Sequence, residues 1–364
     1  MIRVLIAEDS VTVRELLVSI LESDPQIQVV GQARNGVEAV ELAKKLRPDL
    51  ITMDVHMPAM DGFAATKEIM VEAPTPIVIV SSSTSRRHVE LSMHALRAGA
   101  LMVVAKPDDP ASPQFNGRQE QFLTMVKAMA DVKVVRRWAR PAAGPQVSPS
   151  TDELRPGGRA VRVVAVAAST GGPAALHRVL GDLPGDFSAP ILVVQHIARG
   201  FTEGLADWLG TGLALQVRLA QDGEPLAPRT VYVAPDDRHL GVRGRDRVAV
   251  VEADPVGGFR PSASFLFESV ARSHGPAVAA VVLTGMGSDG VQGLEAVRKA
   301  GGTVIAQDEA TSVVYGMPGA AVAAGVVDVV LPVERIGGRL LALVRKEEGL
   351  TAGRSPRQQR KENA

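Results

Sequence analysis

The sequence predicts an α/β protein made of two doubly wound domains with mainly parallel sheets. Two observations carry this prediction. Short apolar segments alternate with helical hydrophobic periods in both halves of the chain, and a joint rich in proline and glycine separates the halves. With 364 residues, 46% of them hydrophobic, the chain is long enough for two domains that each bury a core.

The first half, up to about residue 138, contains five apolar segments typical of buried strands. Val, Ile and Leu dominate them, as expected of parallel strands covered on both faces. The segments lie at 4–7, 27–30, 49–53, 76–80 and 101–105. Helical spacing recurs between them, first in Val13, Leu16, Leu17, Ile20 and Leu21. A closing helix is expected around 122–129 and can reach Trp138, which completes a doubly wound sheet.

The joint at 140–160 contains four prolines and three glycines, and it predicts a semi-extended linker. The second half then repeats the alternation of strands and helices. Its apolar segments lie at 161–169, 189–197, 230–235, 277–285, 302–309 and 326–332. Two further segments, 239–244 and 247–253, follow each other closely and predict an antiparallel hairpin. The polar end of the chain is expected to be disordered.

The composition excludes several classes of function. Lys plus Arg and Asp plus Glu both number 40, so the formal net charge is zero, whereas a sequence-independent nucleic-acid binder needs a basic surface. Aromatic residues make up only 3%, too few for base-stacking platforms. The absence of cysteine excludes disulfides and thiolate metal sites, and it favours a cytoplasmic location. We expect neither a signal peptide nor a membrane-inserted helix.

Polar side chains follow four of the five strands predicted in the first half. They are Glu8 and Asp9 after the first strand, Asp54 after the third, Ser81 after the fourth and Lys106 after the fifth. Because the carboxyl ends of parallel strands meet at one edge, these groups should converge there. Converging carboxylates suit a hard cation such as Mg²⁺, and a lysine with a hydroxyl suits a phosphoryl group. Each acid alone could instead be a solvated loop residue or a helix cap.

This set of residues, with Asp54 inside MDVHMPAMDG and Pro107 after Lys106, resembles a two-component receiver domain of flavodoxin-like fold. The resemblance covers residues 1–125. It implies that a chemotaxis-type histidine kinase phosphorylates Asp54, and that Ser81 and Lys106 act as switch residues. It implies Mg²⁺ ligands from Glu8, Asp9, Asp54 and the backbone carbonyl of His56. It also implies a cis bond between Lys106 and Pro107.

In the second half, the stretch VVAVAASTGGPAAL at 163–176 begins as a strand and ends as a helix. A phosphate-binding loop would need a lysine and another glycine spacing. Ser169 or Thr170 could instead cap the helix, since proline follows early in it. A third interpretation is a nucleophile elbow, which projects the Ser169 hydroxyl above the sheet edge, where a helix N-terminus can stabilise an oxyanion. Such a serine needs a base at neutral pH.

Four histidines in the second half compete for the role of base. His196 ends the strand ILVVQ, at the sheet edge that also carries Ser169. His177 lies in the helix after Ser169, facing away from the strand tip. His239 is a modest competitor in a loop, and His274 is expected at the surface.

The base in turn needs an orienting carboxylate. Asp289 lies in the turn LTGMGSDG after an apolar strand, again at the carboxyl edge. Its alternative role is to cap the helix that follows it. Asp236, Asp237 and Asp308 are alternative acids.

The motifs ASTGGP, VVQHI, FTEGLADWL, LTGMGSDG, AQDE and YGMP occur in this order and resemble the CheB-type chemotaxis protein-glutamate methylesterase family. The resemblance covers about 161–335, with the receiver ahead of it. It implies Ser169 as the nucleophile, His196 as the base and Asp289 as the acid that orients the base. It also implies an oxyanion contact from the Met286 N–H and support from Thr170.

The chain departs from this family pattern at two positions. Ala167 stands where glycine is common, and it could crowd the turn before the nucleophile. Ser264 stands where an acid is common, and it could alter contact with the receiver or the substrate. Neither departure removes a member of the triad.

The resemblance implies a phosphorylation-activated esterase that hydrolyses glutamate γ-methyl esters on the cytoplasmic domains of methyl-accepting chemoreceptors and also deamidates receptor glutamines. The unphosphorylated receiver would inhibit the catalytic domain. Mg²⁺ would serve the receiver, and the esterase chemistry would need no cofactor. A non-enzymatic, phosphorylation-dependent adaptor is the alternative, whereas a DNA-binding output lacks a basic recognition helix. The expected domains are a receiver at 1–125, a helix extension and linker at 126–160, a methylesterase domain at 161–346 and a disordered tail at 347–364.

Overall fold

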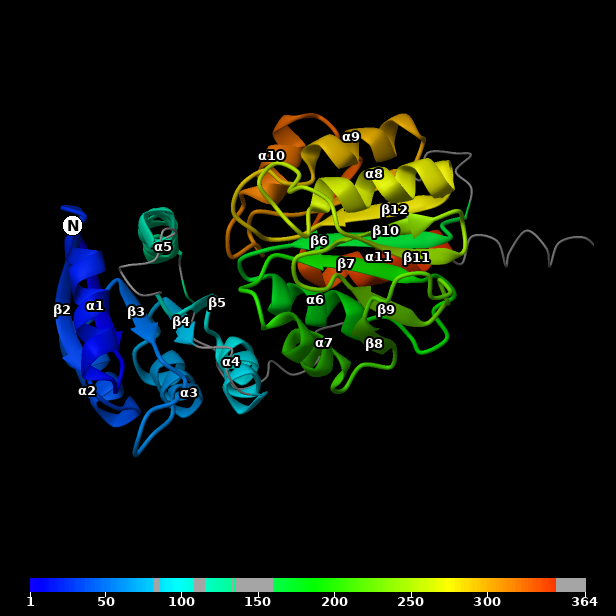
Figure 1. Ribbon diagram of the computed structural model, residues 1–364. Coiled ribbons are helices and arrows are strands. Elements are labelled where there is room, and N and C mark those ends of the chain that lie inside the picture. Colours follow the sequence, from blue (N-terminus) through cyan, green and yellow to red (C-terminus); the bar gives the residue numbers. More distant parts are fainter. Residues whose placement is uncertain (82–85, 108–114, 133, 135–159, 345–364) are drawn as a thin grey trace, which may run out of the picture. The chain divides into compact units, whose positions relative to one another are not determined.

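The computed structural model describes residues 1–81, 86–107, 115–132, 134 and 160–344, which form two compact units with separate parallel sheets (Figure 1). The predicted α/β class with two doubly wound sheets is confirmed. Trp138, the predicted linker up to residue 159 and the predicted tail at 347–364 lie outside the described residues. Among the described residues, no helix is both long enough and apolar enough to span a bilayer.

The first unit contains a five-stranded sheet in the order β2-β1-β3-β4-β5. All five strands were predicted, and every neighbouring pair is parallel. The strands are β1 (Ile2–Ala7), β2 (Ile27–Ala33), β3 (Leu50–Met53), β4 (Ile77–Ser81) and β5 (Met102–Ala105). Strands β3 and β4 are buried along their whole length, but the edge strands β2 and β5 each leave residues partly exposed. The expectation that all five strands are covered on both faces is therefore met only by inner strands of the sheet.

In the described part of the first unit, five helices cover this sheet, and the first three begin at side-chain caps. They are α1 (Val11–Glu22), α2 (Gly36–Leu46), α3 (Gly62–Glu72), α4 (Arg86–Ala98) and α5 (Phe115–Ala130). Ser10, Asn35 and Asp61 each accept a hydrogen bond from the backbone N–H three residues later, which satisfies an otherwise unpaired donor of the first turn. The cap of α1 starts that helix just beyond the carboxyl end of β1, so the loop that holds Glu8 and Asp9 is short. The longer loop that holds Asp54 runs from the end of β3 at Met53 to the cap of α3 at Asp61.

The second unit contains a seven-stranded parallel sheet in the order β14-β13-β12-β6-β7-β9-β8 and a separate antiparallel hairpin, β10-β11. The sheet strands are β6 (Val163–Ala168), β7 (Ile191–Gln195), β8 (Gln216–Leu219), β9 (Thr230–Val233), β12 (Val278–Val282), β13 (Thr303–Gln307) and β14 (Val329–Leu331). The hairpin is formed by β10 (His239–Arg243) and β11 (Arg247–Val251), as predicted. Only β8 was not predicted, because this edge strand is short and alternates exposed with half-buried residues.

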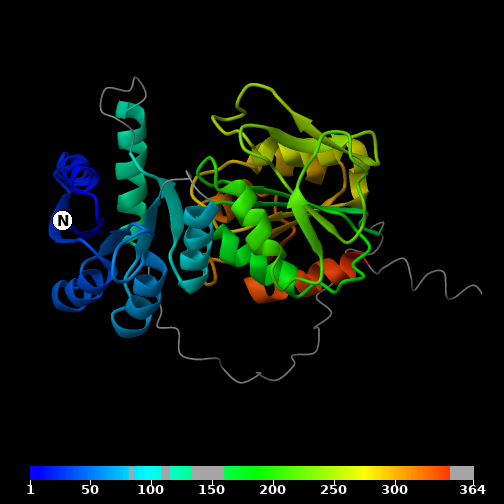
Figure 2. The same cartoon turned by 60° about the horizontal axis from the view of Figure 1, so that its bottom comes forward.

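Helices lie on both faces of the larger sheet. The helices of this half of the chain are α6 (Gly172–Gly181), α7 (Thr202–Gly210), α8 (Ala263–His274), α9 (Val291–Lys299), α10 (Met317–Ala323) and α11 (Val333–Val344), and a 3₁₀ turn lies at Gly275–Ala277. Helices α8, α9 and α10 cover one face (Figure 1), and α6 packs beside α11 on the other (Figure 2). Alternate residues of β6 enter the two layers, so the whole strand is buried.

The order of strands sets where a site can form. From β6 the chain proceeds to β7 on one side, and it later returns to β12 on the other side. Open α/β sheets bind ligands at such a reversal, beyond the carboxyl ends of the two strands on either side of it, which here are β6 and β12. In the first unit the same reversal separates β1 from β3. The residues after β1, β3, β6 and β12 are therefore the ones to examine.

Candidate active site

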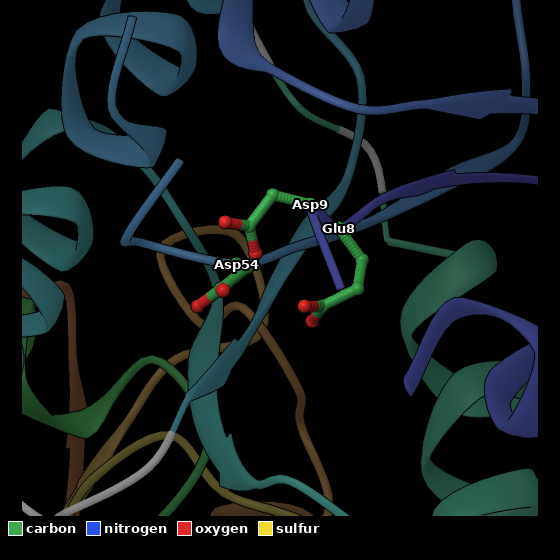
Figure 3. Close-up of side chains that lie close together, drawn as sticks. All are labelled: Glu8, Asp9 and Asp54. Atoms are coloured by element: carbon green, nitrogen blue, oxygen red, sulfur yellow. The ribbon is translucent and has the colours of Figure 1, made fainter. Parts of the chain in front are cut away.

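The structure brings the predicted polar groups of the first unit together at the carboxyl ends of β1, β3 and β5. Ligand oxygens of Glu8, Asp9 and Asp54 lie within 4.8 Å of one another (Figure 3). The Lys106 Nζ lies 2.8 Å from Asp54 Oδ2 and 2.8 Å from Glu8 Oε2. Glu8 and Asp54 are buried, so this ammonium partly offsets two carboxylates that solvent does not reach.

The electrostatics of this cluster favour an added cation. Burial, reinforced by the nearby charge of Asp54, raises the pKa of Glu8 to about 7, although Lys106 opposes this shift. Burial acts to lower the pKa of Lys106, but Asp54 and Glu8 together raise it above its usual value. Three crowded carboxylates with hard oxygen donors match the ligand preference of Mg²⁺. The residues present therefore fit the predicted metal.

The remaining predicted residues of the first unit lie around this cluster. Ser81 is fully buried at the end of β4, and its carbonyl accepts a hydrogen bond of 3.0 Å from the Lys106 N–H. The His56 N–H donates to Asp54 Oδ1 at 3.3 Å, while a metal contact of the His56 carbonyl stays a prediction. The predicted cis bond before Pro107 is wrong, because Arg260–Pro261 is the only cis bond within the described ranges. Lys106 thus reaches both carboxylates with a trans bond, the ordinary form even before proline.

In the second unit, Ser169 is the first residue after β6 and is held there by its backbone. Its N–H donates to the Thr284 carbonyl at 3.0 Å, and its carbonyl accepts from the Gly172 N–H at 2.8 Å. The carbonyl also accepts from the Gln195 side-chain amide at 2.7 Å. Three bonds from three different segments fix this peptide. Ser169 itself is half-buried.

The helix-cap interpretation of Ser169 and Thr170 is wrong. The N-cap of α6 is Gly171, and no side chain caps this helix end. Gly171 has φ of 74°, a left-handed conformation that glycine adopts without a steric penalty. The glycine lets the chain turn sharply from β6 into α6, so the Ser169 hydroxyl is not consumed by capping. The geometry matches the strand-turn-helix of a nucleophile elbow.

Gly285 approaches the Ser169 turn so closely that no side chain fits between them. A Cβ atom at position 285 would lie 2.6 Å from Ser169 Cβ and 3.0 Å from Ser169 N. The Gly285 carbonyl accepts bonds from the N–H groups of Gly316 and Met317, at 3.1 and 2.8 Å. The loop after β12 is therefore clamped between the Ser169 turn and the start of α10.

His196 follows β7 directly, and β7 pairs with β6 so that Gln195 lies opposite Ala168. The next residues, Ser169 and His196, therefore leave neighbouring strands at the same edge, as predicted. Gln195 is buried and spans the two strand ends through its bond to the Ser169 carbonyl. A hydrogen bond between the Ser169 hydroxyl and His196 stays a prediction.

The competing histidines have other environments. His239 is fully buried, with Nδ1 accepting from the Ser262 N–H at 3.3 Å and Nε2 lying 3.0 Å from the Asp254 carbonyl. Both ring nitrogens are engaged, so His239 is not a base. His274 ends α8, and its Nδ1 lies 2.8 Å from Ser273 Oγ. It is half-buried, whereas the sequence suggested a surface position. His177 lies in the second turn of α6.

Asp289 occupies the turn after β12, and its carboxylate accepts three hydrogen bonds from the N-terminus of α8. Its Oδ1 accepts from Ser262 Oγ at 3.0 Å and from Ser264 N at 3.1 Å. Its Oδ2 accepts from Ala263 N at 2.7 Å. The expected alternative, a cap on the following helix, is wrong, because the N-cap of α9 is Gly290 and no side chain caps this helix end. A bond from Asp289 to His196 stays a prediction.

The two departures from the family pattern are both internal. Ala167 belongs to β6 rather than to the turn, and its side chain lies in the hydrophobic core. Ser264 is buried, and its Oγ accepts a bond of 2.9 Å from the Gly290 N–H, so it holds the Asp289 turn. Of the alternative acids, Asp308 binds Thr311 within its own loop.

Sequence reasoning missed four residues that shape this site: Gln195, Ser262, Thr284 and Gly285. Gln195 gave a weak signal, because an amide at the end of the apolar strand ILVVQ needs a buried partner. Thr284 bonds the Thr170 carbonyl at 2.9 Å through its hydroxyl, and Gly285 packs on Ser169. These contacts join segments more than 100 residues apart, so no local pattern could reveal them.

Comparison with known proteins agrees with this geometry. The sequence model of the CheB methylesterase family matches residues 164–340, and that of the response regulator receiver domain matches residues 4–112. A protein-glutamate methylesterase/protein-glutamine glutaminase of Myxococcus xanthus is 55% identical over 96% of this chain and 99% of its own length. A relative of the same description from Anaeromyxobacter dehalogenans is 53% identical over 95% of this chain and 100% of its own.

A solved structure extends the comparison to the fold. The CheB methylesterase catalytic domain of Thermotoga maritima has a TM-score of 0.50 and 40% sequence identity, and the match covers 51% of this chain and 100% of that one. Taken with the sheet order and the turn after β6, these matches show that the chain belongs to the CheB methylesterase family and carries a response regulator receiver domain ahead of its methylesterase domain.

Proposed function

We propose that this methylesterase hydrolyses glutamate γ-methyl esters on the cytoplasmic domains of methyl-accepting chemoreceptors and deamidates receptor glutamines. The observation that carries the proposal is the Ser169 turn, which leaves the central strand between the ends of β7 and β12 with its hydroxyl not used as a cap. The names of the relatives supply the reaction on protein glutamate and glutamine residues, and the resemblance to the chemotaxis family supplies the receptor as the substrate. In this proposal the reaction takes place in the cytoplasm, where the receptor domains that serve as substrate lie.

The chemistry follows from the residue types at three strand ends. His196 takes the proton of the Ser169 hydroxyl as the oxygen attacks the ester carbonyl carbon. The tetrahedral intermediate collapses, the C–O bond to methanol breaks, and His196 returns the proton to the leaving methoxide. Water, deprotonated by His196, then attacks the acyl carbon, the bond to the Ser169 oxygen breaks, and His196 returns the proton to that oxygen, which frees the glutamate and regenerates Ser169. Asp289 holds the imidazole in the required tautomer and stabilises it when charged.

The Met286 N–H is the proposed oxyanion donor. Its neighbours are committed elsewhere, since Gly285, Gly316 and Met317 all donate to backbone carbonyls. Within the described ranges, the Met286 N–H donates to no backbone carbonyl. One well-placed donor of this kind contributes roughly 3–4 kcal/mol to transition-state stabilisation. Thr170 supports the turn, because it is buried and its carbonyl is tied to Thr284.

The receiver controls this activity in the proposal. A chemotaxis-type histidine kinase phosphorylates Asp54. Glu8, Asp9, Asp54 and the His56 carbonyl would hold Mg²⁺, which would supply positive charge for the phosphoryl group, while Lys106 and Ser81 face the new charge. The unphosphorylated receiver inhibits the methylesterase domain, since a tether gives a local concentration on the order of millimolar. We assign the receiver to 1–125, the helix extension and linker to 126–160 and the catalytic domain to 161–346.

Methanol release from methylated receptor tests the proposal directly. Full-length protein with Mg²⁺ and beryllofluoride, a phosphoryl mimic, should release methanol faster than the untreated protein. Asp54→Asn should abolish this activation, whereas Asp131→Asn, which removes an exposed acid, should retain it. Ammonia release from a receptor with unmodified glutamines tests the deamidase activity. Activation that survives Asp54→Asn would reject the proposed switch, and methanol release that does not depend on enzyme would reject the esterase.

A further inference from the structure

The carboxylate of Asp289 is held by the N-terminus of α8, a helix whose N-cap residue, Ser262, lies 27 residues before it in the sequence. Three donors of that helix end reach it: Ser262 Oγ at 3.0 Å, Ala263 N at 2.7 Å and Ser264 N at 3.1 Å. The Gly290 N–H returns a bond to Ser264 Oγ. Since helix N-termini carry partial positive charge, the site suits an ionised carboxylate.

Among these three donors, Ser262 provides the only side-chain group. It is fully buried, and its hydroxyl oxygen also accepts from the Phe265 N–H at 3.4 Å as the N-cap of α8. A hydroxyl has one proton, and this proton goes to Asp289. The orientation of the Ser262 side chain thus sets the direction of the hydrogen bond that its hydroxyl donates to Asp289 Oδ1.

Ser262 is itself held by His239. The Ser262 N–H donates to His239 Nδ1, and His239 Nε2 faces the Asp254 carbonyl at 3.0 Å. Because one nitrogen accepts and the other faces an acceptor, the ring is neutral with its proton on Nε2. The ring also stacks on Phe265 with a centroid separation of 4.5 Å. A buried chain of polar groups therefore runs from His239 through Ser262 to Asp289.

We propose that Ser262 is a positioning residue for the esterase reaction, acting through Asp289. This inference rests on the proposed function, in which Asp289 orients His196. With its hydroxyl in place, the Asp289 carboxylate cannot rotate without breaking a charge-assisted bond. Without the hydroxyl, the carboxylate loses the side-chain donor that the start of α8 supplies, so the oxygen it presents to the imidazole is less firmly fixed. The loss should affect the rate of the chemical step rather than receptor binding.

Two substitutions remove the hydroxyl in different ways. Ser262→Ala removes both the bond and the helix cap, whereas Ser262→Gly removes the bond but retains most of the capping preference. Both should lower kcat roughly tenfold to hundredfold, the range expected for a hydrogen bond to a charged group, with KM within twofold of wild type. Ser269→Ala is the matched control, because Ser269 is a buried serine of the same helix that bonds Val242 instead of Asp289. It should leave kcat unchanged.

Combination with Asp289→Asn shows whether Ser262 acts through Asp289. In full-length protein activated with beryllofluoride, Ser262→Gly should slow methanol release strongly alone and less than twofold in the Asp289→Asn background. Thermal melting of each variant checks the fold. Two results would overturn the positioning role but leave the triad intact. In the first, Asp289→Asn is slow but Ser262→Gly alone is as fast as wild type. In the second, Ser262→Gly slows the Asp289→Asn enzyme by the same factor as it slows wild type. An Asp289→Asn enzyme as fast as wild type would overturn the proposed triad instead.

Discussion

The contact between Gly285 and Ser169 predicts that a single methyl group disables the enzyme without unfolding it. In Gly285→Ala the new Cβ would lie 2.6 Å from Ser169 Cβ and 2.6 Å from Met317 Sδ. The Met317 thioether is flexible and can move away, but the Ser169 backbone is fixed by three hydrogen bonds. Ordinary contact begins near 3.4 Å, so the Ser169 turn must shift by about 0.8 Å, the difference between 3.4 and 2.6 Å.

A displacement of this size is large for a nucleophile. A misplacement near 1 Å costs on the order of 100-fold in rate, so kcat/KM for methanol release should fall about 100-fold. Overpacking should cost about 2 kcal/mol of unfolding free energy, which lowers the melting temperature by roughly 4–8 °C. The rate is measured with full-length, beryllofluoride-activated protein and methylated receptor, and the fold by circular dichroism.

Gly338→Ala is the matched control for this substitution. Gly338 lies in α11 with open space around its Cβ position, so alanine there should retain the rate and slightly stabilise the helix. A Gly285→Ala enzyme that works within twofold of wild type would refute the argument that Gly285 sets the position of Ser169.

Three further predictions follow from the described contacts. Because burial and Asp54 raise the pKa of Glu8 to about 7, Mg²⁺ must displace a proton from Glu8 below that pH. The affinity of the protein for Mg²⁺, measured by calorimetry, should therefore fall up to about tenfold per pH unit below 7. An affinity that is equal at pH 6 and pH 8 would contradict this. Gln195→Met removes the side-chain bond to the Ser169 carbonyl and should lower kcat/KM about fivefold, the usual effect of one hydrogen bond, so an unchanged rate would argue against its role. Burial, with Arg245 and Arg162 nearby, lowers the pKa of His274, so its contribution to stability is fully present above pH 6.5 and is lost as the pH falls through the lowered folded value. His274→Asn should therefore flatten the dependence of melting temperature on pH between 5 and 7, and an identical dependence in both proteins would count against this assignment.

Most of the fold was accessible from the sequence because buried parallel strands are apolar along their length. The segments around β6 and β12, for example, are almost entirely Val and Ala, and the structure buries every residue of both. Strand β8 escaped prediction because its residues Gln216–Leu219 alternate in exposure and form an edge. Its place depends on pairing with β9, which no local pattern reports.

The candidate site was accessible only in part. Strand ends locate Ser169, Asp54 and Lys106 correctly, because a parallel sheet gathers its carboxyl ends at one edge. The environment of Asp289 was not predictable, since its carboxylate pairs with the start of α8 rather than with the helix beside it in sequence. For the same reason Ser264 could not be recognised as a support of the Asp289 turn. Such contacts are set by packing between α8 and α9.

Nucleophilic attack by the Ser169 hydroxyl is the central claim, and comparison of Ser169→Ala with wild type in the methanol assay tests it most directly. Ser273→Ala is the control, because this serine hydroxyl bonds carbonyls inside α8. With both variants activated and folded, Ser169→Ala should lose at least about a thousandfold in kcat, as expected when a triad nucleophile is removed, while Ser273→Ala should match wild type. Methanol release by Ser169→Ala at the wild-type rate would contradict the account.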